Sequence, residues 1–174
     1  MPGGPSARHS FFKNQSGMDI TPVSNLEQLT QARELFQEYG ELLRGGHGAC
    51  CLVSFQSEID GLPGEYAPPG GNLLLASDGG STSGCVALRK IGPNIGEMKR
   101  LYVRPRFRGL GIGRALTDAV IALARRSQYA AIRLDTLPSM LEAAALYESM
   151  GFNRIAPYGD FHPPGAVCME LDLT

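Results

Sequence analysis

The sequence is short of several features that would assign a protein to a broad class. It contains no tryptophan, only three histidines and no long apolar run. The longest runs, such as Leu73 to Ala76, are far shorter than the roughly 20 residues that a membrane-spanning helix needs. Lys plus Arg (16) nearly balance Asp plus Glu (17), so there is no global basic field for a nucleic acid. We expect neither a membrane nor a nucleic acid as partner, and any recognition by charge should be local.

Metal-ligand spacing is also missing. The histidines and cysteines are His9, His47, His162, Cys50, Cys51, Cys85 and Cys168. No histidine pair has the spacing of helical ligands, and no C-x-x-C pair is present, so the pattern predicts no metal site. Free thiols are typical of reducing compartments, which predicts a cytoplasmic protein with Cys85 and Cys168 inside strands.

The length and composition suit one domain. A chain of 174 residues with 43% hydrophobic residues can bury a sizeable core. Residues 1–17 are rich in Gly, Pro and Ser and lack the apolar core of a signal peptide, so we interpret them as a flexible tail. The prediction is a single domain over residues 18–174.

Apolar periodicity and breakers predict the elements. A Ser24–Glu27 capping box starts a helix that Gly45–Gly46 ends, and a Ser139–Glu142 box starts another that Gly151 ends. The segment 47–71 has no clear period, and its only helical signal is a turn at 57–62. The other expected elements are strands at 19–23, 72–77, 84–89, 94–103, 130–136, 152–155 and 167–171, and a helix at 112–126. This order indicates an α/β (α+β) fold with a mixed sheet flanked by helices.

One stretch, from Glu97 to Leu116, stands out: E-M-K-R-L-Y-V-R-P-R-F-R-G-L-G-I-G-R-A-L. An apolar strand leads through a basic turn and alternating glycines into a helix. The amino end of a helix exposes unpaired N–H groups, and a glycine-rich turn can bring them close to a phosphate. The turn carries Arg104, Arg106, Arg108 and Arg114. These features predict a cradle for a small polyanionic ligand.

The glycine spacing does not fit the two common nucleotide motifs. A dinucleotide fingerprint needs G-x-G-x-x-G directly after a strand, but Arg114 or Leu116 would occupy the third glycine position. A Walker A loop needs a lysine and a hydroxyl residue that are not present here. A dinucleotide-binding domain therefore remains only a weak alternative.

The sequence resembles the GNAT superfamily of N-acyltransferases. The R-x-x-G-x-G signature is met by Arg108, Gly111 and Gly113, and a second block, A-A-I-R-L-D-T-L-P-S-M-L-E-A-A-A-L-Y-E-S-M-G-F, follows at the expected distance. The resemblance implies a mostly antiparallel sheet of about six to seven strands, with 94–103 and 130–136 as a splayed parallel pair. It also implies acetyl-CoA as co-substrate and acetyl transfer to an amine of a small molecule or peptide. The alternative is a non-catalytic acyl-CoA sensor, and a homodimer is compatible with either.

The resemblance also assigns residues. Those implied to bind acetyl-CoA are Leu101, Tyr102, Val103, Arg108, Gly109, Leu110, Gly111, Ile112, Gly113, Arg114, Ser139 and Tyr147. Tyr147 matches the family's general acid, and the alternative is an aromatic side chain packed on its helix. Glu97 matches a position where several members carry the general base, and the alternative is an ion-paired strand residue. Many members have an asparagine where this chain has Met140, and Ser139 is the nearest replacement.

Overall fold

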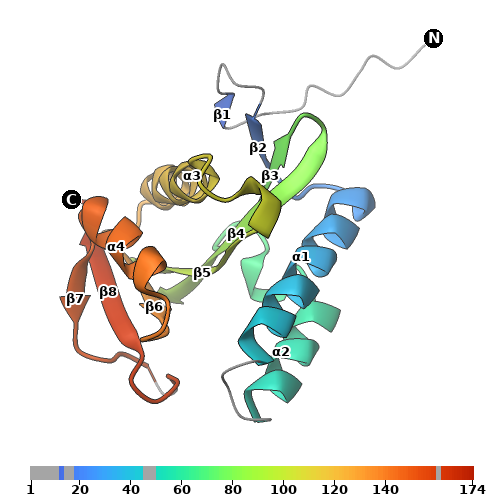
Figure 1. The fold of residues 1–174 in the computed structure, drawn as a ribbon. Helices are drawn as coiled ribbons and strands as arrows, with labels where there is room; N and C mark the ends of the chain where they lie inside the picture. The colour runs from blue at the N-terminus through green and yellow to red at the C-terminus, as the bar shows by residue number, and fades with distance from the viewer. Residues whose placement is uncertain (1–11, 14–17, 45–49, 160–161) are drawn as a thin grey trace.

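The computed structural model describes residues 12–13, 18–44, 50–159 and 162–174. One sheet with the order β1-β2-β3-β4-β5-β6-β8-β7 runs through the molecule, and helices lie on both of its faces (Figure 1). The strands are β1 Phe12–Lys13, β2 Met18–Pro22, β3 Asn72–Asp78, β4 Ser81–Gly92, β5 Ile95–Val103, β6 Ala131–Thr136, β7 Asn153–Ile155 and β8 Val167–Asp172. The helices are α1 Leu26–Arg44, α2 Cys50–Asp60, α3 Ile112–Arg126 and α4 Leu141–Ser149, with short 3₁₀ turns η1 Gly64–Tyr66 and η2 Pro105–Phe107.

The expected fold class is confirmed. The pairings within the sheet are antiparallel except between β5 and β6, which are parallel. Such a sheet is not the doubly wound parallel sheet of a dinucleotide-binding domain. The strand beyond the expected six to seven is β1, whose Phe12 pairs with Ile20 of β2. It lies inside the predicted tail, and residues 1–11 and 14–17 of that tail lie outside the described residues.

The two predicted capping boxes are wrong in detail. At α1 the cap lies one residue later than expected. The Asn25 side chain accepts a hydrogen bond from the backbone N–H of Gln28, and the Gln28 side chain accepts one from the backbone N–H of Ser24. Gln28 therefore takes the part predicted for Glu27. At α4 the cap residue is Met140, with no side-chain cap, because the turn after β6 continues through Ser139.

The segment 47–71 is more regular than predicted. It contains α2, and its residues 47–49 lie outside the described part of the chain. Phe55 and Ile59 are buried against α1, and Leu62 follows them into the same cluster. Their spacing of four and three is a helical signal, which the neighbouring Gly and Pro residues obscured.

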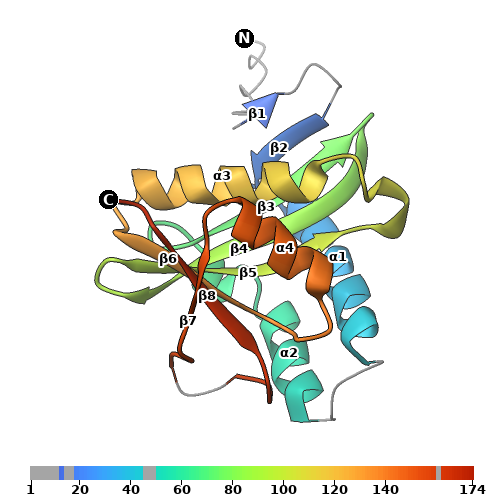
Figure 2. The same ribbon diagram turned by 60° about the vertical axis from the view of Figure 1, so that its left-hand side comes forward.

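The two faces of the sheet have separate cores. One core lies under α3 and α4 and includes Leu88, Met98 and Leu116. The other lies under α1 and α2 and includes Phe36 and Tyr102. Figures 1 and 2 show these helix pairs on opposite sides of the sheet. No helix in the described residues is long and apolar enough to cross a membrane.

Candidate active site

The parallel strands β5 and β6 separate halfway along their length. Their ladder consists of Ile95–Ala131, Gly96–Ile132 and Glu97–Arg133, and it stops there. Beyond it, β5 remains paired with β4 as far as Val103, while β6 remains paired with β8 as far as Thr136. Each strand thus follows its antiparallel neighbour. The predicted splay is therefore present, and in the described part of the sheet no strand pairs with the β6-facing edge of β5 from Met98 to Val103.

A cavity of about 230 Å³ opens where the strands separate. β5 contributes residues 98–101 to its lining and β6 contributes residues 134–136. Tyr39 of α1 and Phe55 of α2 close one side, and Ala143 and Tyr147 of α4 close the other. Of the predicted strand residues, Leu101 lines this cavity, whereas the side chain of Tyr102 is buried on the α1 face and donates to Glu38.

The glycine turn lies where β5 passes through η2 into α3. Gly109 and Gly111 have φ values of +76° and +79°, which L-residues rarely adopt. A Cβ atom at either position would meet no atom within 4 Å, so the chain needs these glycines for backbone conformation. The helix that follows leaves the N–H groups of Ile112, Gly113 and Arg114 without an intrahelical acceptor. Gly109, Leu110 and Gly111 are exposed on the turn, so its backbone can receive an anion.

The arginines near this turn differ in their availability. Arg104 is held by Glu38, with N–O distances of 2.7 to 3.0 Å, so it supports α1 and is not a free cation of the cradle. Arg108 is exposed and donates to the carbonyl oxygen of Val103. Arg114 is exposed and donates to Ser149 of α4 at 2.6 Å. Because Arg104 is bound to Glu38, the turn has one cation fewer for a phosphate than the sequence predicted.

Tyr147 occupies the α4 wall of the cavity. Its side chain is 6% exposed and its ring packs on Phe152 at 5.8 Å between centroids. Burial raises the pKa of Tyr147, so its hydroxyl keeps its proton at neutral pH. Met140 also lines the cavity, whereas Ser139 is exposed in the preceding turn and is not among the lining residues.

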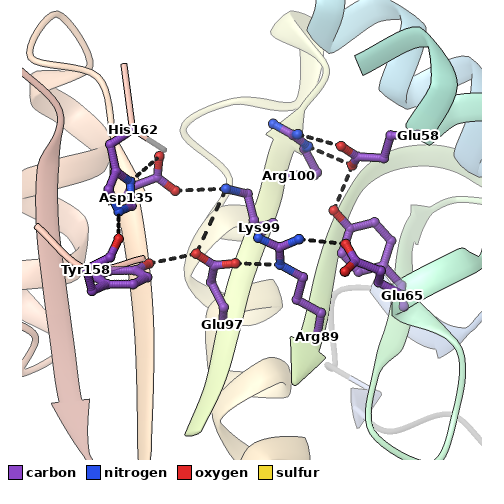
Figure 3. Close-up of polar contacts among 10 residues, drawn as sticks. Glu58, Glu65, Arg89, Glu97, Lys99, Arg100, Asp135, Tyr158 and His162 are labelled. Carbon is purple, nitrogen blue, oxygen red and sulfur yellow. Dashed lines mark hydrogen bonds and ion pairs between the residues drawn. The ribbon is translucent and has the colours of Figure 1, made fainter. Parts of the chain in front are cut away.

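Glu97 lies at the point where the ladder ends, and its carboxylate is largely buried. Figure 3 shows its contacts with Arg89, Lys99 and Tyr158. One oxygen accepts from Arg89 Nε at 2.6 Å and the other from the Tyr158 hydroxyl at 2.8 Å. Burial and the Glu97 charge raise the pKa of Tyr158, which keeps this hydroxyl a donor. Glu97 does not line the cavity; Lys99 Nζ lies 4.0 Å from it on the cavity side.

An ion pair crosses the splay: Lys99 Nζ of β5 lies 3.0 Å from Asp135 Oδ1 of β6 (Figure 3). His162 Nδ1 approaches the other Asp135 oxygen at 3.5 Å, and His162 Nε2 contacts the carbonyl oxygen of Tyr158. Burial raises the pKa of Asp135, but Lys99 outweighs that effect, so the pKa is lowered and the group stays ionised. The sequence interpretation did not assign Lys99 or Asp135 to the site. Each is one of several charges in its strand: β5 also carries Glu97 and Arg100, and β6 also carries Arg133.

A second polar group holds α2 against β5. Arg100 has a φ of +59°, and its guanidinium donates to both oxygens of Glu58 at 2.9 and 2.6 Å. The same guanidinium lies 4.6 Å from the ring centroid of Phe55, and the Tyr66 hydroxyl donates to Glu58. The contacts of Arg100 with Glu58 and with the Phe55 ring hold Phe55 in the wall of the cavity.

A mixed sheet with one splayed parallel pair, a cavity at the splay and a glycine turn at a helix start together define a fold that binds an acyl-CoA. The chain belongs to the Acetyltransferase (GNAT) family, whose profile matches residues 31–152. An uncharacterised N-acetyltransferase of Schizosaccharomyces pombe is 37% identical over 164 residues, which covers 91% of this chain and 97% of that protein. The N-acetylaspartate synthetase of Danio rerio is 36% identical over 71% of this chain and 43% of its own length.

Solved structures agree on the fold. A Streptococcus agalactiae acetyltransferase superposes with a TM-score of 0.74 at 22% identity, over 90% of this chain and 98% of its own. The PaiA N-acetyltransferase of Thermoplasma acidophilum in complex with coenzyme A superposes with a TM-score of 0.71 at 18% identity, over 89% of this chain and 98% of its own. This chain is an acyl-CoA-dependent N-acyltransferase with acetyl-CoA as its co-substrate. In the described part of the chain, no group of three or more His, Cys, Asp or Glu residues could hold a metal ion.

Proposed function

We propose that the protein transfers an acetyl group from acetyl-CoA directly to the primary amine of a small molecule or peptide in the cytoplasm. The observation that carries this proposal is Tyr147, a buried tyrosine in the wall of the cavity where β5 and β6 separate. The β6-facing edge of β5 from Leu101 to Val103 offers main-chain groups to the pantetheine arm. The turn and helix start from Arg108 to Arg114 offer N–H groups and cations to the pyrophosphate.

In this mechanism the acceptor arrives as an ammonium ion and gives up two protons. Glu97 takes one, through water, because its carboxylate stands behind Lys99 and not at the cavity surface. One N–C bond forms and one C–S bond breaks, and Tyr147 gives a proton to the departing thiolate. Tyr147 is then reprotonated by the second amine proton. The net change is one amide, one thiol and one proton released to solvent.

The relatives support a small acceptor. N-acetylaspartate synthetase is named for an acetylated amino acid, and this chain spans less than half of that protein's length. The curated N-acetyltransferases among the relatives favour an enzyme over a non-catalytic sensor.

The test is Tyr147→Phe, which removes the hydroxyl and keeps the packing on Phe152. Loss of the acid should lower kcat for thiol release about 100-fold or more, with an unchanged Kd for coenzyme A by calorimetry. The matched control is Tyr129→Phe, which removes a buried tyrosine hydroxyl outside the cavity and should retain normal kcat. Full activity of Tyr147→Phe would show that Tyr147 is only a packing residue.

A further inference from the structure

The polar groups of the cavity are paired in a way that bears on the acceptor. Three cations lie at or beside it: Arg89, Lys99 and Arg100. Arg100 lines the cavity, but its Nε and Nη2 both donate to Glu58. Arg89 donates from Nε to Glu97 and from Nη1 to Glu65. Both guanidinium groups are therefore committed to protein carboxylates.

Lys99 differs from these arginines. A lysine ammonium has three N–H donors. Among the described residues, its one side-chain hydrogen bond goes to Asp135, because Glu97 at 4.0 Å is beyond hydrogen-bond distance. Its side chain is 16% exposed, and the residue lines the cavity. Lys99 can therefore donate a hydrogen bond to a ligand carboxylate without first losing a protein partner.

Asp135 provides the complementary charge. It lines the same cavity, is 14% exposed and has an Oδ1 atom 3.0 Å from Lys99 Nζ. An α-amino acid carries an ammonium and a carboxylate on one carbon, so it presents two opposite charges to this pair at once. A simple alkylamine would satisfy Asp135 only.

The remaining wall indicates the side chain of the acceptor. Tyr39, Leu43 and Phe55 line the cavity from α1 and α2, and Pro163 lines it from the segment before β8. These groups are apolar or aromatic. A second carboxylate, as in aspartate, would face Arg100, which is already held by Glu58.

We propose that the amine acceptor is an α-amino acid with an apolar side chain, recognised through its carboxylate by Lys99 and through its ammonium by Asp135. This inference rests on the proposed acetyl transfer. It differs from the substrate that the name N-acetylaspartate synthetase indicates for that relative.

The experiment compares kcat/KM of the wild-type protein with acetyl-CoA and four acceptors: L-phenylalanine, phenethylamine, L-leucine and L-aspartate. Phenethylamine is phenylalanine without its carboxylate. A charge-assisted contact of the carboxylate should favour phenylalanine over phenethylamine by about 10- to 100-fold. The kcat/KM values for leucine and for phenylalanine should both exceed the value for aspartate. A rate with phenethylamine equal to or above that with phenylalanine overturns carboxylate recognition, and a preference for aspartate overturns the apolar assignment.

If no thiol is released with any of the four acceptors, nor with any amine of a broader panel, the proposed acetyl transfer is refuted, and this inference with it. Activity on amines without a carboxylate preference refutes the inference alone. The two failures are therefore distinguishable.

Variants of Lys99 test whether this residue is the source of the preference for a carboxylate, measured as the phenylalanine-to-phenethylamine ratio of kcat/KM. Lys99→Met should reduce the phenylalanine-to-phenethylamine ratio about tenfold or more, and Lys99→Arg should restore much of it because the charge remains. Lys90→Met, at an exposed lysine of β4 outside the cavity, is the matched control and should keep the wild-type ratio. An unchanged ratio in folded Lys99→Met, judged by circular dichroism, overturns the role of Lys99.

Discussion

Burial and neighbouring charges set the protonation states of the residues in this site. Tyr147 and Tyr158 are both protonated donors at neutral pH because burial raises the pKa of each hydroxyl. Asp135 is an ionised carboxylate because Lys99 outweighs the effect of burial. The site therefore contains a proton donor and a fixed negative charge in one cavity, without a metal ion in the proposed chemistry.

The pH profile of kcat tests the state of Tyr147. Its pKa lies above the ordinary tyrosine value of about 10, and the protonated form is the active acid. Loss of that proton should therefore not reduce the rate anywhere below pH 10. At saturating substrates, kcat measured by thiol release should rise with pH as the amine loses its proton, and then stay level up to about pH 9.5. A descending limb centred between pH 8 and 9 would mean that a different group is the acid.

Single residues were predictable from sequence where a motif carries them. Tyr147 was assigned from the L-Y-x-x-x-G-F pattern, and the structure places it on α4 in the cavity wall, while its role stays a prediction. Lys99 and Asp135 were not found, because their pairing depends on the register of two strands that lie 36 positions apart in the chain. Glu97 was assigned through the resemblance, but its contact with Tyr158 was not, because the two residues lie 61 positions apart in the chain.

At the scale of elements, the glycine turn and the start of α3 act as one unit. The sequence predicted this unit well, since glycine spacing and charge are local properties. The structure adds a second reason for the glycines, which is the positive φ at Gly109 and Gly111, and the space around both positions is open. The helix α2 was missed because Pro and Gly in its flanks outweighed a short apolar period.

The variant Gly111→Ala tests whether the backbone of the turn binds the co-substrate. An alanine at a φ of +79° should cost about 1–2 kcal/mol in the free energy of unfolding. Relief of this strain by moving the turn should also weaken coenzyme A binding about tenfold. The matched control is Gly79→Ala, at a φ of +55° in the turn between β3 and β4.

Urea unfolding and calorimetry with coenzyme A separate the two effects. Gly79→Ala should lose similar stability and keep the wild-type Kd for coenzyme A. Equal Kd values for the two variants would contradict a role of this turn in binding.

At the scale of the whole molecule, the site exists because β5 and β6 belong to two parts of one sheet that diverge. The β2-to-β5 part follows its antiparallel ladders between α3 on one face and α1 and α2 on the other, and the β6, β7 and β8 part follows its own ladders (Figure 2). The splay was predictable only through family resemblance, since no local pattern in β5 or β6 says where a ladder stops. Contacts that span these layers, such as Arg100 to Glu58, hold the cavity wall in place.

The Arg100–Glu58 pair should make the stability of the protein depend on pH in a defined direction. Burial raises the pKa of Glu58, but the Arg100 contact outweighs it, so the folded-state pKa lies below the ordinary value of 4.5. The unfolded chain then binds more protons as the pH falls through that range, so the stabilisation is fully present above pH 4.5 and lost below it. Glu58→Gln should lose about 2 kcal/mol in the free energy of unfolding at pH 7.

That loss should shrink as the pH falls from about 5 to 3, because the wild-type protein loses the same interaction there. Urea unfolding at several pH values measures it, with Asp118→Asn, an exposed carboxylate on α3, as the control. Asp118→Asn should track the wild-type protein at every pH. A difference between Glu58→Gln and wild type that stays constant down to pH 3 would mean that the ionised Glu58 carboxylate is not what holds α2 to the sheet. Because Phe55 is held by the same contact, the loss at pH 7 should be accompanied by a higher KM for the amine and an unchanged Kd for coenzyme A.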